Sequence, residues 1–216
     1  MLNRMILFCP ILAALLAAGC AFESGGNDDG GLKPDGKTDG SDSGLQYPPG
    51  PYGAEYMDTV ENFTVDECIC SGTTAVGRGM KFERFLGAKA VLVTVHAGWC
   101  TYCKQQAATM EDGLWQKYKD QGLQMLLVSF QDEKGGADRQ ALLDYCCKNK
   151  ADFHMTFTQA IDPNAKVMDQ FFRPTQAGTP LNMLLDRHMR IRYKVEGLIP
   201  QSYILEGNIE GLLSEQ

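Results

Sequence analysis

Two cysteines separated by two residues are the part of this sequence best suited to chemistry. Cys100 and Cys103 form the pattern Cys-Thr-Tyr-Cys, shortly after an apolar run that ends at Val95. Thiols at this spacing can close a small disulfide ring and exchange it with a partner's disulfide or dithiol. A cysteine at a helix N-terminus also faces unpaired backbone N–H groups, which favour its thiolate. We therefore expect Cys100 to be the nucleophile and Cys103 to resolve the mixed disulfide.

The elements around the pair must place it at such a helix N-terminus. Residues 90–95 are aliphatic and mostly β-branched, which predicts a buried central strand. Residues 104–120 are polar and Ala-rich and predict a helix that Gly122 ends. Its apolar residues recur at helical spacing and should face the sheet; they are Ala107, Met110, Leu114 and Tyr118.

Metal binding is the alternative interpretation of the cysteine pair. A structural zinc site needs four ligands, usually a second Cys-x-x-Cys or a closely spaced His pair. The three histidines are scattered, at His96, His154 and His188. We expect no metal and no cofactor, but two other functions stay open. One is a copper-binding or metallochaperone module that uses the same cysteines, and the other is a structural lipoprotein with an inert disulfide.

Two segments carry a family resemblance. Residues 98–104, after a hydrophobic strand, resemble the thioredoxin active site, and residues 178–186 resemble the cis-proline segment of that superfamily. The arrangement is most similar to the TlpA-like (redoxin) thiol–disulfide oxidoreductases that are tethered to membranes outside the cytoplasm, over roughly residues 62–213. It implies an α/β fold of thioredoxin type. This fold has a central mixed β-sheet flanked by helices, with a helix–strand insertion before the cis-proline.

The resemblance also implies roles for residues near the pair. Pro180 should follow a cis peptide bond, which only proline forms at low cost, and Thr179 should lie beside Cys100, where a substrate strand can pair with it. Trp99 should be a partly exposed lid over the disulfide. The alternatives are an ordinary trans Pro180 that opens a strand and a Trp99 that simply packs.

The chain departs from the family pattern behind Cys103. Thr94 occupies the strand position where thioredoxin carries a buried acid that assists deprotonation of the second cysteine. Gln106 stands where many TlpA-like proteins have Glu, and Ala108 replaces a helix-kinking proline. His96, two residues after Thr94 on the same strand face, either substitutes electrostatically or is a packed strand histidine.

Residues near the pair bear on the direction of electron flow and on whether the protein could reduce peroxide. Thr101 and Tyr102 match neither the Gly-Pro of reducing thioredoxins nor the Pro-His of strong oxidants, so isomerase or oxidase work stays an alternative to reduction. Peroxiredoxins carry Pro and Thr seven and three residues before the peroxidatic cysteine. Here those positions are Val93 and Ala97, so we do not expect peroxide reduction.

Residues 1–50 of the sequence predict export and anchoring. Residues 1–20 combine Arg4 with an apolar run too short for a membrane span. Residues 17–20 resemble a bacterial lipobox, which implies lipidation of Cys20; a plain secretory signal is the alternative. Ala21 after the cysteine favours the outer membrane. Residues 21–50 are rich in Gly, Asp and Ser and predict a flexible tether before the domain at 51–216.

Four further cysteines are unusual for this family. Outside the cytoplasm Cys68, Cys70, Cys146 and Cys147 suggest structural disulfides. Local pairing would close strained rings, so we favour cross-links between the N-terminal segment and the helix at 137–148. A second electron relay or a thiolate site for Cu(I) is the alternative.

Further elements follow from the pattern of apolar residues and turns. Strands are predicted at 62–69, 123–130 and 154–157, helical turns at 80–86, and helices at 137–148, at 162–172 with Pro163 in the first position, and from about 200. A hairpin is predicted from 181–185 and 191–195.

Taken together, these features predict a lipid-anchored thiol–disulfide oxidoreductase on the periplasmic side of a bacterial membrane. It would exchange disulfides with periplasmic proteins in the reducing direction and take electrons from a membrane-bound donor. The net charge is −7 and there is no basic stripe, so nucleic acid is not an expected partner.

Overall fold

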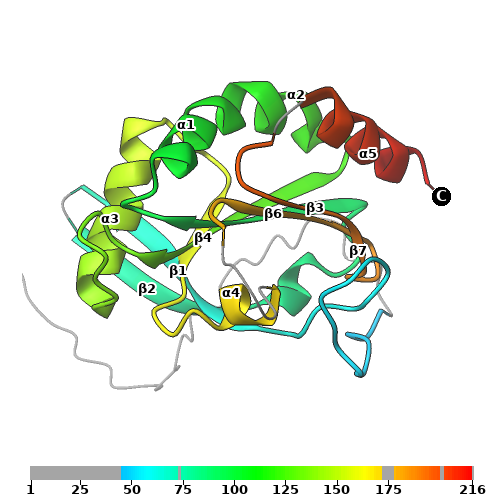
Figure 1. Ribbon diagram of the computed structural model, residues 1–216, viewed down its shortest axis with the longest axis horizontal. Helices are drawn as coiled ribbons and strands as arrows, with labels where there is room; N and C mark the ends of the chain where they lie inside the picture. Colours follow the sequence, from blue (N-terminus) through cyan, green and yellow to red (C-terminus); the bar gives the residue numbers. More distant parts are fainter. Residues whose placement is uncertain (1–44, 73, 172–177, 200–201, 216) are drawn as a thin grey trace, which may run out of the picture. The chain divides into compact units, whose positions relative to one another are not determined.

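A seven-stranded mixed β-sheet forms the centre of the fold (Figure 1). This computed structural model describes residues 45–72, 74–171, 178–199 and 202–215. The strand order is β2-β1-β5-β4-β3-β6-β7. In chain order the strands are β1 (Thr64–Ser71), β2 (Thr74–Lys81), β3 (Ala90–Ala97), β4 (Leu123–Gln131), β5 (Thr158–Ile161), β6 (Leu181–Asp186) and β7 (Ile191–Glu196). β3, β4 and β5 are parallel, and the other neighbouring pairs are antiparallel.

Helices cover both faces of this sheet (Figure 1). One face carries α1 (Thr101–Met110), α3 (Arg139–Asp152) and α5 (Ser202–Ser214), whose apolar side chains pack on the strands. The other face is covered by the 3₁₀ turn η1 (Phe82–Phe85) and by α4 (Lys166–Phe171). This is the α/β thioredoxin-like fold that the sequence analysis expected. The interpretation of α3 and β5 as an insertion stays a prediction.

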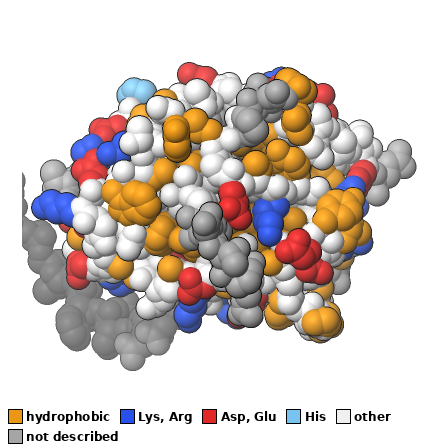
Figure 2. Space-filling model, in the orientation of Figure 1, with side chains coloured by type: hydrophobic (Ala, Val, Ile, Leu, Met, Phe, Trp, Pro, Cys, Tyr) orange, Lys and Arg blue, Asp and Glu red, His pale blue; other side chains and the backbone are white. Residues whose placement is uncertain are grey.

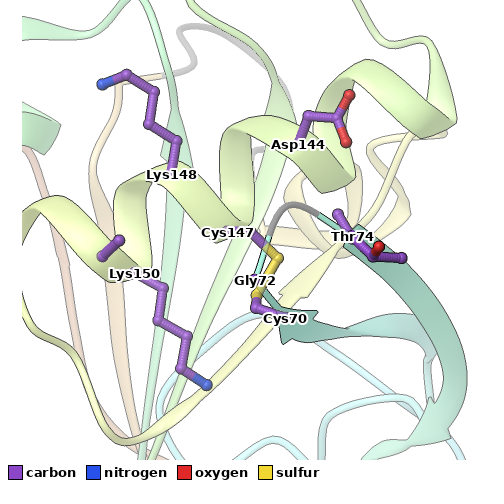
Figure 3. Close-up of a pocket in the computed structure, with 9 residues that line it drawn as sticks. Cys70, Gly72, Thr74, Asp144, Cys147, Lys148 and Lys150 are labelled. Atoms are coloured by element: carbon purple, nitrogen blue, oxygen red, sulfur yellow. A yellow bond between two sulfur atoms is a disulfide. The ribbon is translucent and has the colours of Figure 1, made fainter. Parts of the chain in front are cut away.

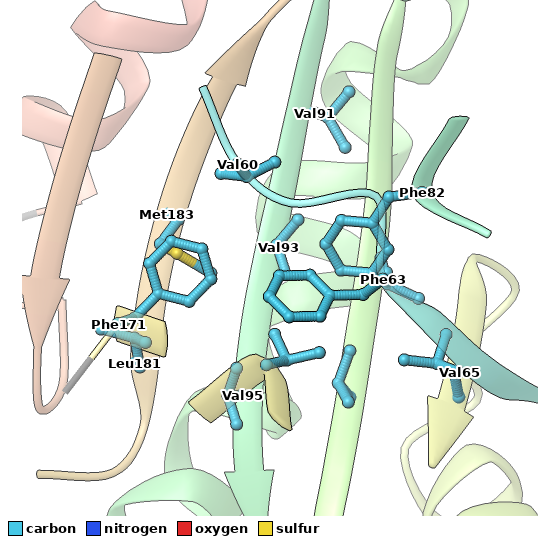
Figure 4. Packing of buried hydrophobic residues seen from close by; sticks show 14 of the residues in the cluster. Val60, Phe63, Val65, Phe82, Val91, Val93, Val95, Phe171, Leu181 and Met183 are labelled. Carbon is cyan, nitrogen blue, oxygen red and sulfur yellow. The ribbon is translucent and has the colours of Figure 1, made fainter. Parts of the chain in front are cut away.

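β3 is the centre of the core, as its run of aliphatic residues predicted. All eight of its residues are buried, between β4 on one side and β6 on the other. Val91, Val93 and Val95 belong to one buried cluster with Phe63 and Phe82, on the face of the sheet that η1 and α4 cover (Figure 4). Leu92 and its neighbours on the opposite face pack against α1 and α5. A strand held this way gives a rigid base to the loop that follows it.

The helix after β3 is longer than α1 alone. It continues through a π-helical turn, η2 (Glu111–Trp115), then α2 (Gln116–Tyr118) and the 3₁₀ turn η3 (Lys119–Gln121). The buried Glu111 carboxylate accepts hydrogen bonds from the backbone N–H and the hydroxyl of Thr156 at 2.8 and 2.7 Å. Gly122 then ends the run with a φ of 112°. The predicted helix and its end are thus confirmed, and the π turn was not foreseen.

Three local features differ from the predictions. The turns predicted at 80–86 are helical only in η1, because Met80 and Lys81 end β2. β2 itself was missed, since Gly77 and Gly79 weaken its strand signal and its pairing with β1 creates it. The strand expected at 154–157 lies at Thr158–Ile161, because His154 takes a φ of 52° in the turn after α3.

The predicted bounds of the last two helices either differ from the structure or lie outside the described residues. α4 begins at Lys166 rather than at Pro163, after Ala165 takes a φ of 53°. The predicted helix end at 172 and the start of the last helix at 200–201 fall outside the described residues, as do Cys20 and most of the predicted tether. From Leu45 the chain is described, and there the Tyr47 hydroxyl donates to the Val60 carbonyl at 2.9 Å.

Candidate functional site

The Cys100–Cys103 pair lies where β3 passes into α1. Two backbone hydrogen bonds fix the loop between β3 and α1. Gly98 N–H donates to the Gln131 carbonyl at 2.8 Å, and Cys100 N–H donates to the Ala97 carbonyl at 3.1 Å. Cys100 is the N-cap residue of α1, and its Sγ accepts a hydrogen bond from the Cys103 N–H at 3.0 Å. The two cysteines form a disulfide. The sulfur of Cys100 therefore faces the donor end of the helix, as the sequence predicted.

Access to the pair is asymmetric. Cys100 is 5% exposed and Cys103 is 1% exposed, so an incoming group meets Cys100 first. Trp99 and Tyr102 beside them are 51% and 58% exposed. The Trp99 indole N–H donates to the Gln131 side-chain carbonyl at 2.8 Å. The ring is thus tethered to the end of β4 and presents half of its surface at the rim of the site.

The segment before β6 completes the site. The Thr179–Pro180 peptide bond is cis, and the Thr179 carbonyl oxygen lies 3.4 Å from Cys100 Sγ. The Pro180 carbonyl accepts from Gly197 N–H at 2.7 Å. The structure therefore places Thr179 beside Cys100, where the resemblance implied that a substrate strand would pair.

A neutral polar network lies behind Cys103, on the next turn of α1. Gln106 and Asn182 exchange two hydrogen bonds, from Gln106 Nε2 to Asn182 Oδ1 at 2.6 Å and from Asn182 Nδ2 to Gln106 Oε1 at 3.1 Å. The Thr94 hydroxyl donates to the same Asn182 oxygen at 3.0 Å. All three side chains are buried. Amides and a hydroxyl thus occupy this position, and none of them can take up a proton near neutral pH.

Asn182 is the residue of this network that the sequence analysis did not single out. It stands among apolar residues in β6, between Leu181 and Met183, and a polar residue in a buried strand needs a hydrogen-bond partner. A polar residue at this position in the sequence therefore indicated a buried hydrogen bond. The partner itself, Gln106, lies 76 residues away and could not be identified from the pattern.

His96 is a packed strand histidine rather than a substitute for the missing acid. It is 1% exposed, and its Nε2 has no hydrogen-bond partner. Burial lowers the pKa of His96 to about 3, so the ring is neutral over the physiological range. Ala108, where the family pattern has proline, lies on the exposed side of α1.

The four other cysteines form two bridges between β1 and α3. Cys68 is joined to Cys146 and Cys70 to Cys147. Both bridges connect the segments that the sequence analysis favoured. They close loops of similar length, with sequence separations of 78 and 77 residues.

The described residues lack two features that bear on function. No group of three or more His, Cys, Asp or Glu side chains there is arranged to hold a metal ion. Within the same ranges, no helix has both the length and the apolar character to cross a bilayer. On the face drawn in Figure 2, acidic and basic side chains are interspersed.

Known structures share this fold. A protein assigned as the thiol:disulfide interchange protein DsbE from Chlorobium tepidum aligns with a TM-score of 0.57 at 24% identity, over 74% of this chain and 99% of the other. The thioredoxin domain of a thiol-disulfide oxidoreductase from Bacteroides vulgatus gives 0.54 at 18%, over 72% and 98%. A secreted disulfide oxidoreductase from Mycobacterium tuberculosis, homologous to DsbE of E. coli, gives 0.51 at 12%, over 69% and 96%.

A family model identifies the relationship at the level of sequence. The model of the AhpC/TSA family matches residues 57–194, which include β3, both site cysteines and the cis-proline. No curated protein matches the chain. The chain therefore belongs to the AhpC/TSA family, and its fold is thioredoxin-like.

Proposed function

We propose that this protein is a lipid-anchored thiol–disulfide oxidoreductase that reduces protein disulfides on the periplasmic side of a bacterial membrane. One observation carries the chemistry. Cys100 Sγ accepts the Cys103 N–H at the start of α1 and lies 3.4 Å from the Thr179 carbonyl. A nucleophilic sulfur, its resolving partner and a backbone edge for an extended substrate are thus brought together.

The reaction follows from this arrangement. In the reduced protein, the Cys100 thiolate attacks one sulfur of a substrate disulfide, and the other substrate sulfur leaves as a thiolate. Cys103 then attacks Cys100 in the mixed disulfide, which releases the second substrate thiol and forms the Cys100–Cys103 bridge. The substrate gains two electrons, which a membrane-bound donor must later return to the pair.

Family membership and the site both support the enzyme class, a thioredoxin-like oxidoreductase. Peroxide reduction is not proposed, because Val93 and Ala97 replace the proline and threonine of peroxiredoxins. The anchor at Cys20, the outer membrane as its location and the flexible tether at 21–50 rest on the sequence. The periplasmic location also suits six cysteines held in disulfides.

Trapping of mixed disulfides tests the proposal. Cys103→Ser leaves the Cys100 thiolate without its resolving partner, so the variant should accumulate reductant-sensitive adducts with periplasmic proteins. Cys100→Ser is the matched control and should give no adduct through Cys103, since Cys103 is 1% exposed. Adducts that map to Cys103 in Cys100→Ser alone would reverse the two roles, and the absence of adducts through either cysteine in both variants would contradict the proposal. An anaerobic copper titration of the reduced protein distinguishes this function from the alternative of a copper-binding metallochaperone.

A further inference from the structure

The two bridges between β1 and α3 differ in their access to solvent. Cys68 and Cys146 are 3% and 0% exposed and pack among Leu142, Leu143 and Ile161. Cys70 is exposed and Cys147 is half-buried. Thiol–disulfide exchange requires an incoming thiolate to reach a sulfur atom. Of these two bridges, only Cys70–Cys147 is accessible to an incoming thiolate in the folded protein.

The accessible bridge lies in a groove. An open cavity of about 540 Å³ lies between α3 and the β1–β2 hairpin, and Figure 3 shows the sulfur–sulfur bond that joins Cys70 to Cys147 within it. Lys148 and Lys150 line this groove and Asp144 is the one acid among its lining residues, although Lys148 also pairs with Asp152.

The Cys70–Cys147 bridge adds less to the stability of the domain than the Cys68–Cys146 bridge does. A disulfide stabilises mainly by closing a loop in the unfolded chain, and more for a longer loop. The Cys68–Cys146 bridge already closes the long loop between β1 and α3. With that loop closed, the second bridge only completes a small ring, which removes less entropy. Cys70–Cys147 can therefore open without releasing β1 from α3.

This bridge is remote from the Cys100–Cys103 pair. β5 and β4 lie between β1 and β3, and three strand spacings amount to roughly 14 Å. β1 also runs antiparallel to the parallel strands β3, β4 and β5. Cys70, near the end of β1, is thus displaced toward the opposite end of the sheet from Cys100, which follows the end of β3. The two disulfides cannot exchange directly within one molecule in this arrangement.

We propose that Cys70–Cys147 is a second redox-active disulfide that oxidises thiols in this groove, while Cys68–Cys146 is the structural bridge. A substrate thiolate attacks the sulfur of Cys70, the more exposed residue of the bridge, the Cys70–Cys147 bond breaks, and Cys147 leaves as a thiolate that takes a proton from water. A second substrate thiol then attacks the mixed disulfide and releases Cys70. Two substrate thiols become one disulfide, and the bridge takes up the two electrons.

Selective opening of the bridge tests this proposal without the first site. The full chain carrying Cys100→Ser and Cys103→Ser is exposed to graded reduced glutathione, quenched by alkylation and mapped by mass spectrometry. Cys70 and Cys147 should open at least about tenfold faster than Cys68 and Cys146, because only the former sulfurs are reachable. Glutathione disulfide should then restore the same Cys70–Cys147 pair. Equal opening of both bridges, opening only on denaturation, or reoxidation into other pairings would overturn the proposal.

A second experiment determines whether the bridge oxidises protein thiols or small thiols. The same oxidised variant is mixed with a reduced copy of the chain that carries only the Cys103→Ser change and so has a free Cys100. A mixed disulfide between Cys100 of one molecule and Cys70 of the other assigns the site to protein thiols, and reaction with glutathione alone assigns it to small thiols. Cys70→Ser with Cys147→Ser should abolish either reaction and keep the fold. Persistence of the reaction in that variant would assign it to other sulfurs and overturn the proposal.

Discussion

Gln106 on α1 and Asn182 on β6 are joined through both ends of their side-chain amides. The two bonds, 2.6 and 3.1 Å long, connect residues 76 positions apart, directly behind the resolving Cys103. The pair fixes the first turns of α1 against the strand that follows Pro180. It holds the two halves of the site in register with neutral groups alone.

We predict that this amide pair is strongly coupled in stability. Asn182→Leu should cost about 1–3 kcal/mol, because it leaves the buried Gln106 amide without a partner. Gln106→Met alone should cost a similar amount. The double variant should cost less than the sum of the two single costs, since both partners are then apolar. Denaturant unfolding of the four proteins measures the coupling; strictly additive costs would show that the bonds contribute nothing as a pair.

Gly98 should tolerate no side chain. A Cβ at this position would lie 2.5 Å from backbone atoms of both Asp132 and Glu133, so Gly98→Ala must move the loop that holds Trp99. We expect a loss of about 1–3 kcal/mol in the free energy of unfolding, the range for overpacking, and slower mixed-disulfide formation at Cys100. Gly113→Ala is the control, because nothing lies within 4 Å of its Cβ and the position is helical. It should stabilise the protein by about 0.5–1 kcal/mol.

His96 should make the protein acid-sensitive. Its folded pKa of about 3 is below the ordinary value of 6.5, so the unfolded chain binds more protons than the folded one between these values. Stability is therefore unaffected above pH 6.5 and falls as the pH drops from 6.5 toward 3, by up to about 1.4 kcal/mol per pH unit. His96→Leu should flatten this slope, measured by urea unfolding at pH 7, 6, 5 and 4. His188→Gln, at an exposed position, is the control.

Cys20 should determine where the protein is found. Cys20→Ser removes the residue that the lipobox-like segment 17–20 presents for lipidation, so the variant should remain unprocessed or be released in soluble form. The measurement is membrane partitioning together with mass spectrometry of the mature N-terminus. Cys9→Ser, in the predicted signal segment, is the control and should partition as the wild type does. An unmodified N-terminus in the wild-type protein would contradict the anchoring proposal.

The sequence by itself determined the local parts of the site. Residues 90–95 could only be a buried strand, because they are aliphatic and largely β-branched. A Cys-x-x-Cys before a helical pattern that ends at Gly122 favoured thiol–disulfide exchange, with copper binding and an inert disulfide as the alternatives. These signals lie within one continuous segment, residues 90–122, so local propensity and periodicity suffice to read them.

Only the tertiary structure decided the features that depend on distant segments. β2 exists because it pairs with β1 despite two glycines, and Asn182 is satisfied because β6 lies opposite α1. The sequence limited the four extra cysteines to three pairings, and the packing of α3 on β1 selected one of them. That same packing buried Cys68–Cys146 and left Cys70–Cys147 open to solvent. Burial is a property of the assembled layers, so no pattern in the chain could separate the structural bridge from the accessible one.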